Sequence, residues 1–285
     1  MIKIFRTRSE AAEFAASVRF SGKTLGFVPT MGALHEGHLS LVRRALQEND
    51  YCMASIFVNP IQFNNPEDLE KYPRTPERDL QMLEEVGCHA VFMPTVEEMY
   101  PDEVTESYDF GHLDKVMEGA FRPGHFNGVA IVVRRLFEIV QPHKAYFGEK
   151  DYQQLAIIRE LVRKHQIPVE IIPCPIVREP DGLAMSSRNM RLSAAGRSKA
   201  PLIYKTLQEA RKMAQNHDVA TVKKWVTDTL KSIEGFEPEY FEIASGETLL
   251  PVNQWDEANT VMGFVVVWLE GVRLIDNIEL RRKHV

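Results

Sequence analysis

The sequence has few cysteines and no long hydrophobic run. Cys52, Cys88 and Cys174 lie far apart and form no C-x-x-C pair, which is typical of a reducing compartment and argues against a zinc ribbon or redox motif. The first residues lack the apolar core of a secretory signal. Apolar runs such as VMGFVVVWL are too short to span a bilayer. We therefore expect a cytoplasmic protein without a membrane partner.

Positive charge is not in excess either. The chain has 34 Lys and Arg against 40 Asp and Glu, a formal net charge of −6, and its basic residues are scattered. Because proteins that bind nucleic acids usually present a basic face, we expect no nucleic-acid partner. A length of 285 residues with 44% hydrophobic residues is sufficient for two domains, or one large one, without disulfides or metals.

Strand-like and helix-like segments alternate through about residue 176. Thr7 and Glu10 have capping-box spacing and predict the start of a helix. Apolar segments such as TLGFVP and YCMASIFVN predict buried strands, and a helical pattern follows each of them. Strands that alternate with helices of this length indicate βαβ crossovers and a mainly parallel sheet. The sequence therefore predicts an α/β fold with a Rossmann-like N-terminal domain over residues 1–176.

The pattern changes after residue 176. Two helical stretches, GRSKAPLIYKTLQEARKMAQ and ATVKKWVTDTLKSI, come before the strand-like PEYFEIAS and TVMGFVVVWLEGVRLIDN. Gly271 lies between two apolar runs in the last of these, which indicates a hairpin. Helices grouped before strands predict a smaller α+β C-terminal domain over residues 177–285.

Two histidines, His35 and His38, stand at the predicted start of a helix in the stretch MGALHEGH. Gly32 and Gly37 have the spacing of a P-loop, but His38 and Leu39 replace its lysine and hydroxyl residue, which argues against a P-loop NTPase. The histidine spacing is also wrong for the zinc motif H-E-x-x-H. A competing structural explanation is that one histidine caps the helix and the other packs.

The position of these histidines favours an anion site. The start of a helix offers unpaired N–H groups and the positive end of the helix dipole. Gly37 lets a ligand approach the backbone closely. Two imidazoles at this position can donate hydrogen bonds to a phosphate and stabilise charge that builds on a phosphoryl group under attack.

Three further polar stretches follow predicted strands or turns. Asn59 and Gln62 in FVNPIQF are neutral groups suited to orienting a small hydroxy acid, with turn chemistry as the competing explanation for Asn59. Lys150 in FGEKDYQQ is a flexible point charge for a triphosphate, while Asp151 suits a helix N-cap. Arg188 and two serines in MSSRN form a compact set of phosphate donors.

In this order, the motifs resemble those of a known family. MGALHEGH is similar to the HxGH signature of the nucleotidylyltransferase superfamily, shared with class I aminoacyl-tRNA synthetases, and MSSRN resembles its second, mobile loop of KMSKS type. With SIFVNPIQF, YPRT, RPGHF, FGEKDYQQLAIIR and RLIDN, nearly the whole chain is identified as a member of the pantoate–β-alanine ligase (pantothenate synthetase) family. Arg188 replaces the superfamily's lysine, as it does in this family.

The resemblance implies an AMP-forming ligase that makes pantothenate, a coenzyme A precursor, from pantoate, β-alanine and ATP, with Mg²⁺ as the accompanying ion. The carboxylate of pantoate attacks the α-phosphate of ATP, which releases pyrophosphate and leaves pantoyl adenylate. The amine of β-alanine then displaces AMP. The family is typically a homodimer. No protein ligand of Mg²⁺ is assigned.

The resemblance also implies residue roles. It makes His38 the catalytic proton donor and gives His35, Lys150 and Arg188 catalytic roles. Gln62 is implied to bind pantoate and β-alanine, and Gln154 to bind pantoate. The MSSRN loop is implied to be a lid carried by the C-terminal domain. The implied ATP-binding residues are Met31, Gly32, Ala33, Leu34, His35, Glu36, Gly37, His38, Gly148, Glu149, Lys150, Asp151, Val177, Met185, Ser186, Ser187 and Arg188.

Two other functions stay open at this point. A related nucleotidyltransferase of the same superfamily would act on a different acid or a phosphorylated acceptor and would keep the nucleotide in its product. A regulatory or tRNA-binding module would bind nucleotide without catalysis, although the acidic balance and the lack of an anticodon-type basic domain argue against it.

Overall fold

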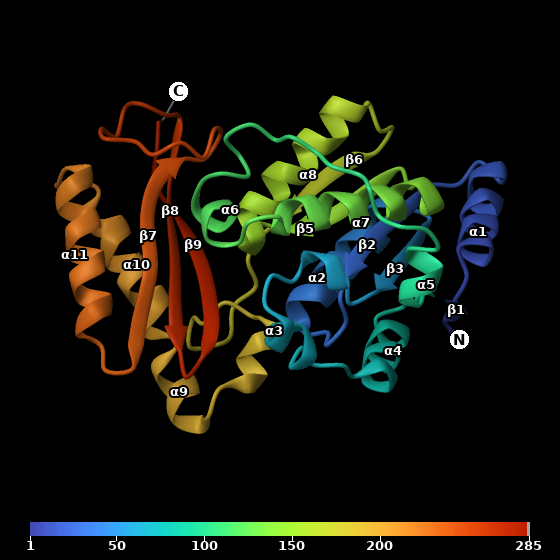
Figure 1. The fold of residues 1–285 in the computed structure, drawn as a ribbon, viewed down its shortest axis with the longest axis horizontal. Helices are drawn as coiled ribbons and strands as arrows, with labels where there is room; N and C mark the ends of the chain where they lie inside the picture. Colours follow the sequence, from blue (N-terminus) through green and yellow to red (C-terminus); the bar gives the residue numbers. More distant parts are fainter. Residues whose placement is uncertain (284–285) are drawn as a thin grey trace. The chain divides into compact units, whose positions relative to one another are not determined.

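The structure is a computed structural model that describes residues 1–283, and its chain forms two compact units (Figure 1). The first unit contains Met1–Glu149 and Gln153–Pro175. The second contains the short segment Lys150–Tyr152 and the chain from Ile176 onward. No local pattern indicates that Lys150–Tyr152, which follows a strand of the first unit, groups with the second.

The first unit is built on a six-stranded sheet in the order β1-β4-β3-β2-β5-β6. Every neighbouring pair is parallel, which confirms the predicted α/β fold. Strand β1 was not predicted, because its three residues are short of the apolar run that indicates a buried strand and two of them are exposed. The strands are β1 (Lys3–Phe5), β2 (Leu25–Thr30), β3 (Tyr51–Ile56), β4 (Ala90–Phe92), β5 (Lys144–Gly148) and β6 (Glu170–Cys174).

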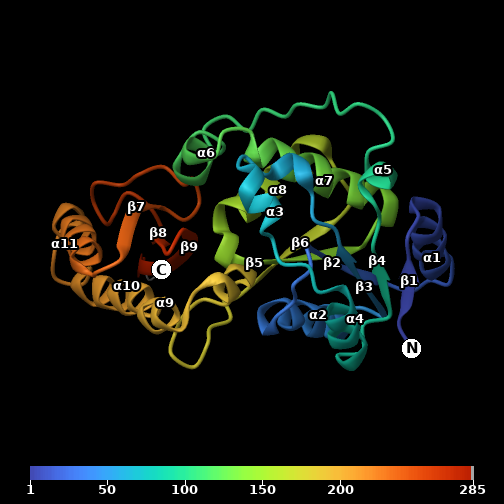
Figure 2. The ribbon, with the colours of Figure 1, turned by 60° about the horizontal axis from the view of Figure 1, so that its bottom comes forward.

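Helices cover both faces of this sheet (Figure 2). On one face, buried side chains of α1 (Arg8–Phe20), α7 (His125–Val140) and α8 (Tyr152–His165) cluster with Phe27 of β2. On the other face, α2 (Glu36–Glu48) and α4 (Pro76–Glu85) pack against Val28. Because successive side chains of a strand point to opposite faces, one apolar strand supplies both cores.

The predicted capping box at the start of α1 is confirmed. The Thr7 hydroxyl accepts from the Glu10 amide at 3.3 Å, and the Glu10 carboxylate accepts from the Thr7 amide at 3.0 Å. Shorter elements interrupt the connections of the first unit. They are η1 (Pro60–Gln62), α3 (Pro66–Glu70), α5 (Val96–Met99), α6 (Met117–Phe121) and η2 (Glu149–Asp151).

The second unit is an antiparallel sheet, in the order β7-β8-β9, packed against two helices (Figure 1). The predicted hairpin is confirmed, because β8 and β9 pair across a turn in which Glu270 and Gly271 have φ of 52° and 70°. Its elements are η3 (Ser187–Arg191), α9 (Ala194–Lys199), α10 (Leu202–Met213), α11 (Val219–Ser232), β7 (Phe236–Ser245), β8 (Thr260–Leu269) and β9 (Val272–Arg282).

The single helix predicted over residues 196–215 is wrong. The structure has two helices there, α9 and α10, and α9 begins earlier, after the N-cap Ser193. Pro201 stands between them. Proline has no backbone N–H to donate, and its ring clashes with the preceding turn. A continuous helix through this position is therefore unfavourable.

The three cysteines are free thiols, and no helix in the described part of the chain is a candidate membrane span. Cys52, Cys88 and Cys174 are buried thiols outside any disulfide. Within residues 1–283, none of the helices combines the length and the apolar character that a membrane crossing requires.

Candidate active site

The candidate site of the first unit lies where β2 and β3 end. The two strands pair in register up to Thr30 and Ile56, so the segments that follow them leave the sheet at the same edge. In parallel sheets this carboxyl edge is where ligands bind. The loop after β2 begins with Met31, and the segment after β3 leads to Gln62. The side-chain nitrogen Nε2 of Gln62 lies 3.1 Å from the Met31 sulfur, so the two segments are in contact.

The loop between β2 and α2 has an unusual backbone. Gly32 and Ala33 have φ of 80° and 49°, in the left-handed region. Glycine adopts this region readily, whereas alanine does so at a cost of about 1–3 kcal/mol. The buried carboxylate of Asp79 on α4 accepts hydrogen bonds from the amides of Ala33 and Leu34, each at 2.8 Å. These bonds stabilise the turn that directly precedes His35.

Both histidines cap helix α2. His35 is the N-cap, and its Nδ1 accepts from the Gly37 amide at 3.1 Å. His38 Nδ1 accepts from the His35 amide at 3.3 Å, and the two ring centroids are 4.1 Å apart. The competing structural explanation is supported in part, because both histidines cap the helix and their rings are in contact. A nitrogen that accepts carries no proton, so these bonds assign the proton of each neutral ring to Nε2. The start of α2, where a helix favours anions, thus carries two imidazoles whose Nδ1 atoms accept from the backbone.

Gln62 is buried at the end of η1, and Asn59 orients its amide. Asn59 Nδ2 donates to Gln62 Oε1 at 3.0 Å and to the Gly128 carbonyl at 3.1 Å. The Tyr100 hydroxyl donates to Asn59 Oδ1 at 2.7 Å. With its oxygen occupied, Gln62 presents its NH₂ group on the side of Met31. Asn59 is therefore satisfied inside the protein, where it orients the Gln62 side chain.

Two residues of the RPGHFNG stretch support this arrangement, and sequence reasoning assigned neither of them a role. A Cβ at Gly128 would lie 2.5 Å from the Ile61 carbonyl oxygen, so only glycine lets α7 approach η1 so closely. His125 Nδ1 lies 2.8 Å from the Gln62 carbonyl oxygen, which can only accept. The backbone of Gln62 is thus fixed as firmly as its side chain.

Two consecutive glutamines at the start of α8 have different environments. Gln153 is buried, donates to the carbonyls of Leu113 and Val116 at 2.7 and 2.8 Å, and accepts from the Glu118 amide at 3.0 Å. Gln154, the predicted pantoate residue, is half-buried. Gln153 therefore has a structural role, and Gln154 is the one of the pair with surface to offer a ligand.

The predicted residues Gly148 and Glu149 lie at the end of β5 and the start of η2, where both are half-buried. A Cβ built on Gly148 meets no atom within 4 Å among the residues of the described chain. The backbone here therefore borders open space. A ligand can approach it closely, which suits the ATP-binding role implied for this glycine.

In the second unit, the segment that carries Lys150 is anchored to the sheet. Asn277 of β9 donates from Nδ2 to the Lys150 carbonyl at 3.0 Å, and the Tyr152 hydroxyl donates to the Gly246 carbonyl at 3.1 Å. The Lys150 ammonium lies 3.8 Å from the carboxylate of Asp151, which is exposed. The backbone of the segment is thus fixed, while the lysine and aspartate side chains stand next to each other.

The same unit brings Val177 together with the MSSRN residues. The Met185 amide donates to the Val177 carbonyl at 3.0 Å. Ser186 Oγ accepts from the Arg188 amide at 3.3 Å and so caps η3, while Ser187 is buried. The predicted loop is a short 3₁₀ helix with a serine cap, and its predicted nucleotide contacts are close neighbours.

A buried ion pair holds the base of this segment. Arg178 donates to both carboxylate oxygens of Asp276 at 2.6 and 2.9 Å, and its guanidinium lies 3.6 Å from the centre of the Tyr204 ring. Burial raises the pKa of the Asp276 carboxyl, and the hydrogen bonds from Arg178 oppose this rise. Asp276 and Asn277 belong to RLIDN, a motif that sequence reasoning used only for the resemblance.

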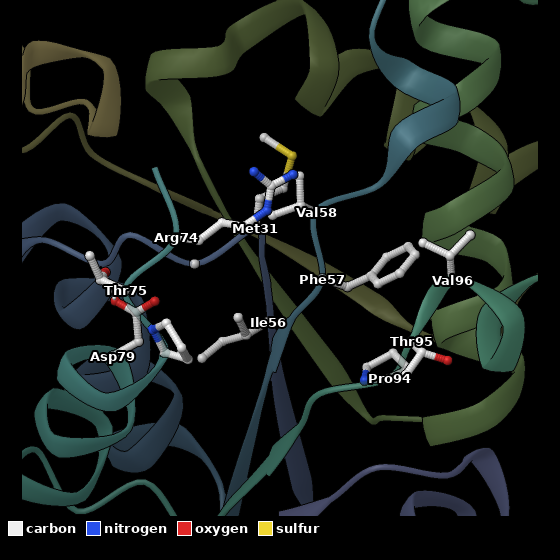
Figure 3. Close-up of a pocket in the computed structure, with 12 residues that line it drawn as sticks. Met31, Ile56, Phe57, Val58, Arg74, Thr75, Asp79, Pro94, Thr95 and Val96 are labelled. Atoms are coloured by element: carbon white, nitrogen blue, oxygen red, sulfur yellow. Dashed lines mark hydrogen bonds between the residues drawn. The ribbon is translucent and has the colours of Figure 1, made fainter. Parts of the chain in front are cut away.

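A cavity of about 300 Å³ lies beside the β2–α2 loop in the first unit (Figure 3). Met31 and Gly32 of the loop border it, as do Thr75 and Asp79 of the α4 region. Figure 3 shows Thr75 and Asp79 together at one side of the cavity. Neither histidine lines it. Within residues 1–283, no three or more His, Cys, Asp or Glu side chains gather in a way that could hold a metal ion.

Comparisons with known proteins agree on one family. A family model described as Pantoate-beta-alanine ligase matches residues 3–279. The chain is 51% identical to a Pantothenate synthetase of Porphyromonas gingivalis over 278 residues, which cover 98% of this chain and 99% of that protein. A Bacteroides fragilis protein of the same name is 51% identical over 280 residues, again 98% of this chain and 99% of that protein.

Solved structures give the same result. The crystal structure of Pantothenate Synthetase from Thermus thermophilus superposes with a TM-score of 0.92 at 46% identity, over 98% of this chain and 99% of that one. Pantoate-beta-alanine Ligase from Francisella tularensis, complexed with beta-gamma ATP and beta-alanine, superposes with a TM-score of 0.82 at 34% identity. That match covers 98% of each chain.

Proposed function

The chain belongs to the pantoate–β-alanine ligase family, and from this premise we propose how its residues catalyse the family's reaction. The activity is the ATP-dependent condensation of pantoate with β-alanine to pantothenate. ATP and β-alanine are the ligands named for the Francisella relative. A nucleotidyltransferase with another acceptor is not favoured, because the matching family model and the relatives named above all have this ligase's name.

The paired caps of α2 support the first step most directly. A carboxylate is a poor acyl donor, so pantoate attacks the α-phosphate of ATP and expels pyrophosphate to give pantoyl adenylate. Negative charge builds on the phosphoryl oxygens during this attack. The Nε2–H groups of His35 and His38, at the positive end of α2, are donors suited to that charge. We assign the catalytic proton-donor role to His38.

The acid is held by neutral amides. Gln62 presents an NH₂ group whose direction is set by Asn59, and Gln154 supplies a half-buried amide from α8. We assign pantoate binding to both glutamines and β-alanine binding to Gln62. In the second step, the β-alanine amine attacks the acyl carbon of the adenylate, the bond to the phosphate oxygen breaks, and AMP leaves.

The second unit supplies donors for the phosphates of ATP. Lys150 offers an ammonium group and Arg188 a guanidinium, and Ser186 and Ser187, which directly precede Arg188 in the chain, offer hydroxyls. We assign ATP binding to these residues together with Val177 and Met185, and to the main chain of Met31–His38 and Gly148–Asp151. The MSSRN loop retains its proposed role as a lid over ATP.

Magnesium fits this donor set as an ion that ATP brings with it. The described residues offer no cluster of three or more metal-binding side chains. Mg²⁺ characteristically takes one or two carboxylates and completes its shell with phosphates and water. The exposed carboxylate of Asp151, beside Lys150, suits one such position. Bound there, the ion would neutralise charge on the departing pyrophosphate.

The cellular setting and assembly are also proposals. A cytoplasmic location suits an enzyme that consumes ATP and carries three buried thiols outside any disulfide. A homodimer is proposed from the family resemblance. Sedimentation of the purified protein tests the latter, since a monomer at micromolar concentration contradicts it.

One isotope experiment tests the proposed chemistry. Pantoate labelled with ¹⁸O in its carboxylate is incubated with ATP, Mg²⁺, β-alanine and the protein. Because the attacking oxygen stays on phosphorus when the amide forms, one label should appear in AMP for each pantothenate made. Formation of ADP and labelled inorganic phosphate would instead show attack on the γ-phosphate, and the adenylate route would be wrong.

A further inference from the structure

Asp79 is a buried residue, and both oxygens of its carboxylate accept hydrogen bonds from within the protein. It is 1% exposed and lies in the first turn of α4. Its Oδ2 accepts from the Ala33 amide, and its Oδ1 accepts from the Leu34 amide and from the Thr75 hydroxyl, the last at 3.0 Å. A buried carboxylate is costly unless it is hydrogen-bonded, so this one is tied to the β2–α2 loop.

The bonds to Asp79 act on a loop that borders a cavity at its start and packs into the core at Leu34. Met31 and Gly32 border the cavity of about 300 Å³ (Figure 3), whereas Ala33 and Leu34 are buried. The left-handed conformation of Gly32 and Ala33 is therefore held by the two hydrogen bonds to Asp79 together with the packing of Leu34 into the core. A Cβ on Gly32 would lie 3.0 Å from Asp79 Oδ2, which shows how closely the carboxylate approaches the backbone.

We propose that Asp79 is a positioning residue for the adenylation step. By holding Ala33 and Leu34, its carboxylate sets the point at which the chain enters α2, and hence the directions of His35 and His38. Thr75 assists by donating to the oxygen that also binds Leu34. This inference rests on the proposed role of the two histidines as phosphate donors.

A favourable interaction with the dipole of α4 does not explain why the Asp79 carboxylate points at the β2–α2 loop. An acidic residue in the first turn of a helix is favourable because of the helix dipole, and α4 has two, Glu77 and Asp79. Glu77 is exposed, whereas Asp79 is directed at the loop. Glu77→Gln is therefore a matched control, since it removes one negative charge from the same turn without affecting the loop.

Hydrogen exchange tests the contact directly. In Asp79→Asn, one oxygen can still accept, but the new NH₂ group faces a backbone N–H. The amides of Ala33 and Leu34 should then exchange about tenfold faster or more than in the wild type, while Glu77→Gln leaves them unchanged. Wild-type protection of both amides in Asp79→Asn would overturn the proposal.

Kinetics test the consequence for catalysis. The exchange of labelled pyrophosphate into ATP, measured at saturating ATP and pantoate, should be about 10- to 100-fold slower in Asp79→Asn and normal in Glu77→Gln. A loss in kcat that exceeds any rise in KM for pantoate is expected, because the acid is held by Gln62 and Gln154. Faster exchange of the two amides in Asp79→Asn with an unchanged kcat would show that Asp79 holds the loop but does not position the histidines. This result would also overturn the proposal.

A second variant covers the case in which Asp79→Asn does not fold. Thr75→Val keeps the shape of the side chain but removes the donor to Asp79 Oδ1, and Thr75→Ser restores it. A several-fold slower pyrophosphate exchange in Thr75→Val, recovered in Thr75→Ser, supports the proposal, and equal rates in all three proteins contradict it. Normal turnover of His38→Ala would instead disprove the donor role of His38, while the amide exchange would still report on the Asp79 contact.

Discussion

Asn277 on β9 donates a hydrogen bond at 3.0 Å to the main-chain oxygen of Lys150, which lies 127 residues earlier in the sequence. The arginine–aspartate pair beside it fixes Asn277 in place, because the Arg178 guanidinium also lies 3.3 Å from the Asn277 carbonyl oxygen. The proposed ATP-binding lysine is therefore carried on a backbone whose position is set by the RLIDN strand.

Replacing this asparagine should impair the use of ATP. In Asn277→Ala, the Lys150 carbonyl loses its partner and the segment can shift, so KM for ATP should rise about tenfold. Steady-state kinetics measure this, with Asn253→Ala, an exposed asparagine of the same unit, as the control. An unchanged KM for ATP in a folded Asn277→Ala protein would mean that this contact does not position Lys150.

His38→Ala should slow adenylate formation on the order of 10²–10³-fold, the usual loss for one preorganised donor. A smaller structural effect should accompany it, because His38 also accepts from the His35 amide, and losing a cap costs about 0.5–2 kcal/mol. Calorimetric melting separates the two effects. His217→Ala, which removes an exposed imidazole in the second unit, should melt and turn over normally.

The consecutive glutamines of α8 allow a sharp contrast. Gln154→Ala should raise the Kd for pantoate and leave ATP binding and the melting temperature nearly unchanged. Gln153→Ala should lower the melting temperature and leave the Kd for pantoate nearly unchanged. It leaves the Leu113 and Val116 carbonyls without their hydrogen-bond donor, at a cost of about 1–3 kcal/mol. Titration calorimetry and thermal melts measure both. Equal effects of the two variants on pantoate binding would argue against the assignment of Gln154.

Asp50 should make the stability of the first unit sensitive to acid. Its carboxylate accepts from the amide and hydroxyl of Thr24, each at 2.9 Å, and from Lys23, and these contacts lower its pKa from 3.8 to about 2. A depressed folded-state pKa stabilises the fold above the unfolded value and loses that effect as pH falls through the folded one. Asp50→Asn should therefore melt below the wild type at pH 7.

The difference should close between about pH 4 and pH 2, as the wild-type carboxylate takes up its proton. Melting curves of both proteins across this range provide the measurement. A gap between the two melting temperatures that stays constant down to pH 2 would show that the Asp50 charge is not its cause.

Local patterns predicted most of the regular structure correctly. The capping box at Thr7, the apolar strand before His35 and the glycine turn at Gly271 each act within a few residues, so the sequence displays them. The failures also have local causes. Strand β1 lacks the apolar run of the other strands, since two of its three residues are exposed. The helical pattern of α9 continued through Pro201 into α10, which hid the break between the two helices.

The supporting residues of the site could not be predicted in this way. Asp79 lies 46 residues from Ala33, and Asn277 lies 127 residues from Lys150. In the sequence, Asp79 is an ordinary acidic residue in the first turn of a helix, and Asn277 is one polar residue in a strand. Only the fold shows which backbone groups they bind. The residues proposed to bind ligands, by contrast, were named from motifs, and their roles stay proposals.

The adenylate intermediate allows the sharpest prediction. If pantoyl adenylate forms on the enzyme, the first step must run and reverse without β-alanine. Labelled pyrophosphate should therefore enter ATP when pantoate and Mg²⁺ are present and β-alanine is absent. Omitting pantoate should stop the exchange, because the α-phosphate then has no carboxylate to attack it.

The controls separate the competing functions. A protein that only binds nucleotide would exchange nothing, and a nucleotidyltransferase would keep an adenylylated product after β-alanine is added instead of releasing AMP. His38→Ala should suppress the exchange at every pantoate concentration, because the proposed role of His38 is at the phosphoryl group. In Gln154→Ala, by contrast, the exchange should be slow at low pantoate and recover at high pantoate. If active wild-type protein exchanges pyrophosphate only when β-alanine is present, all three substrates must react together, and the two-step mechanism is wrong.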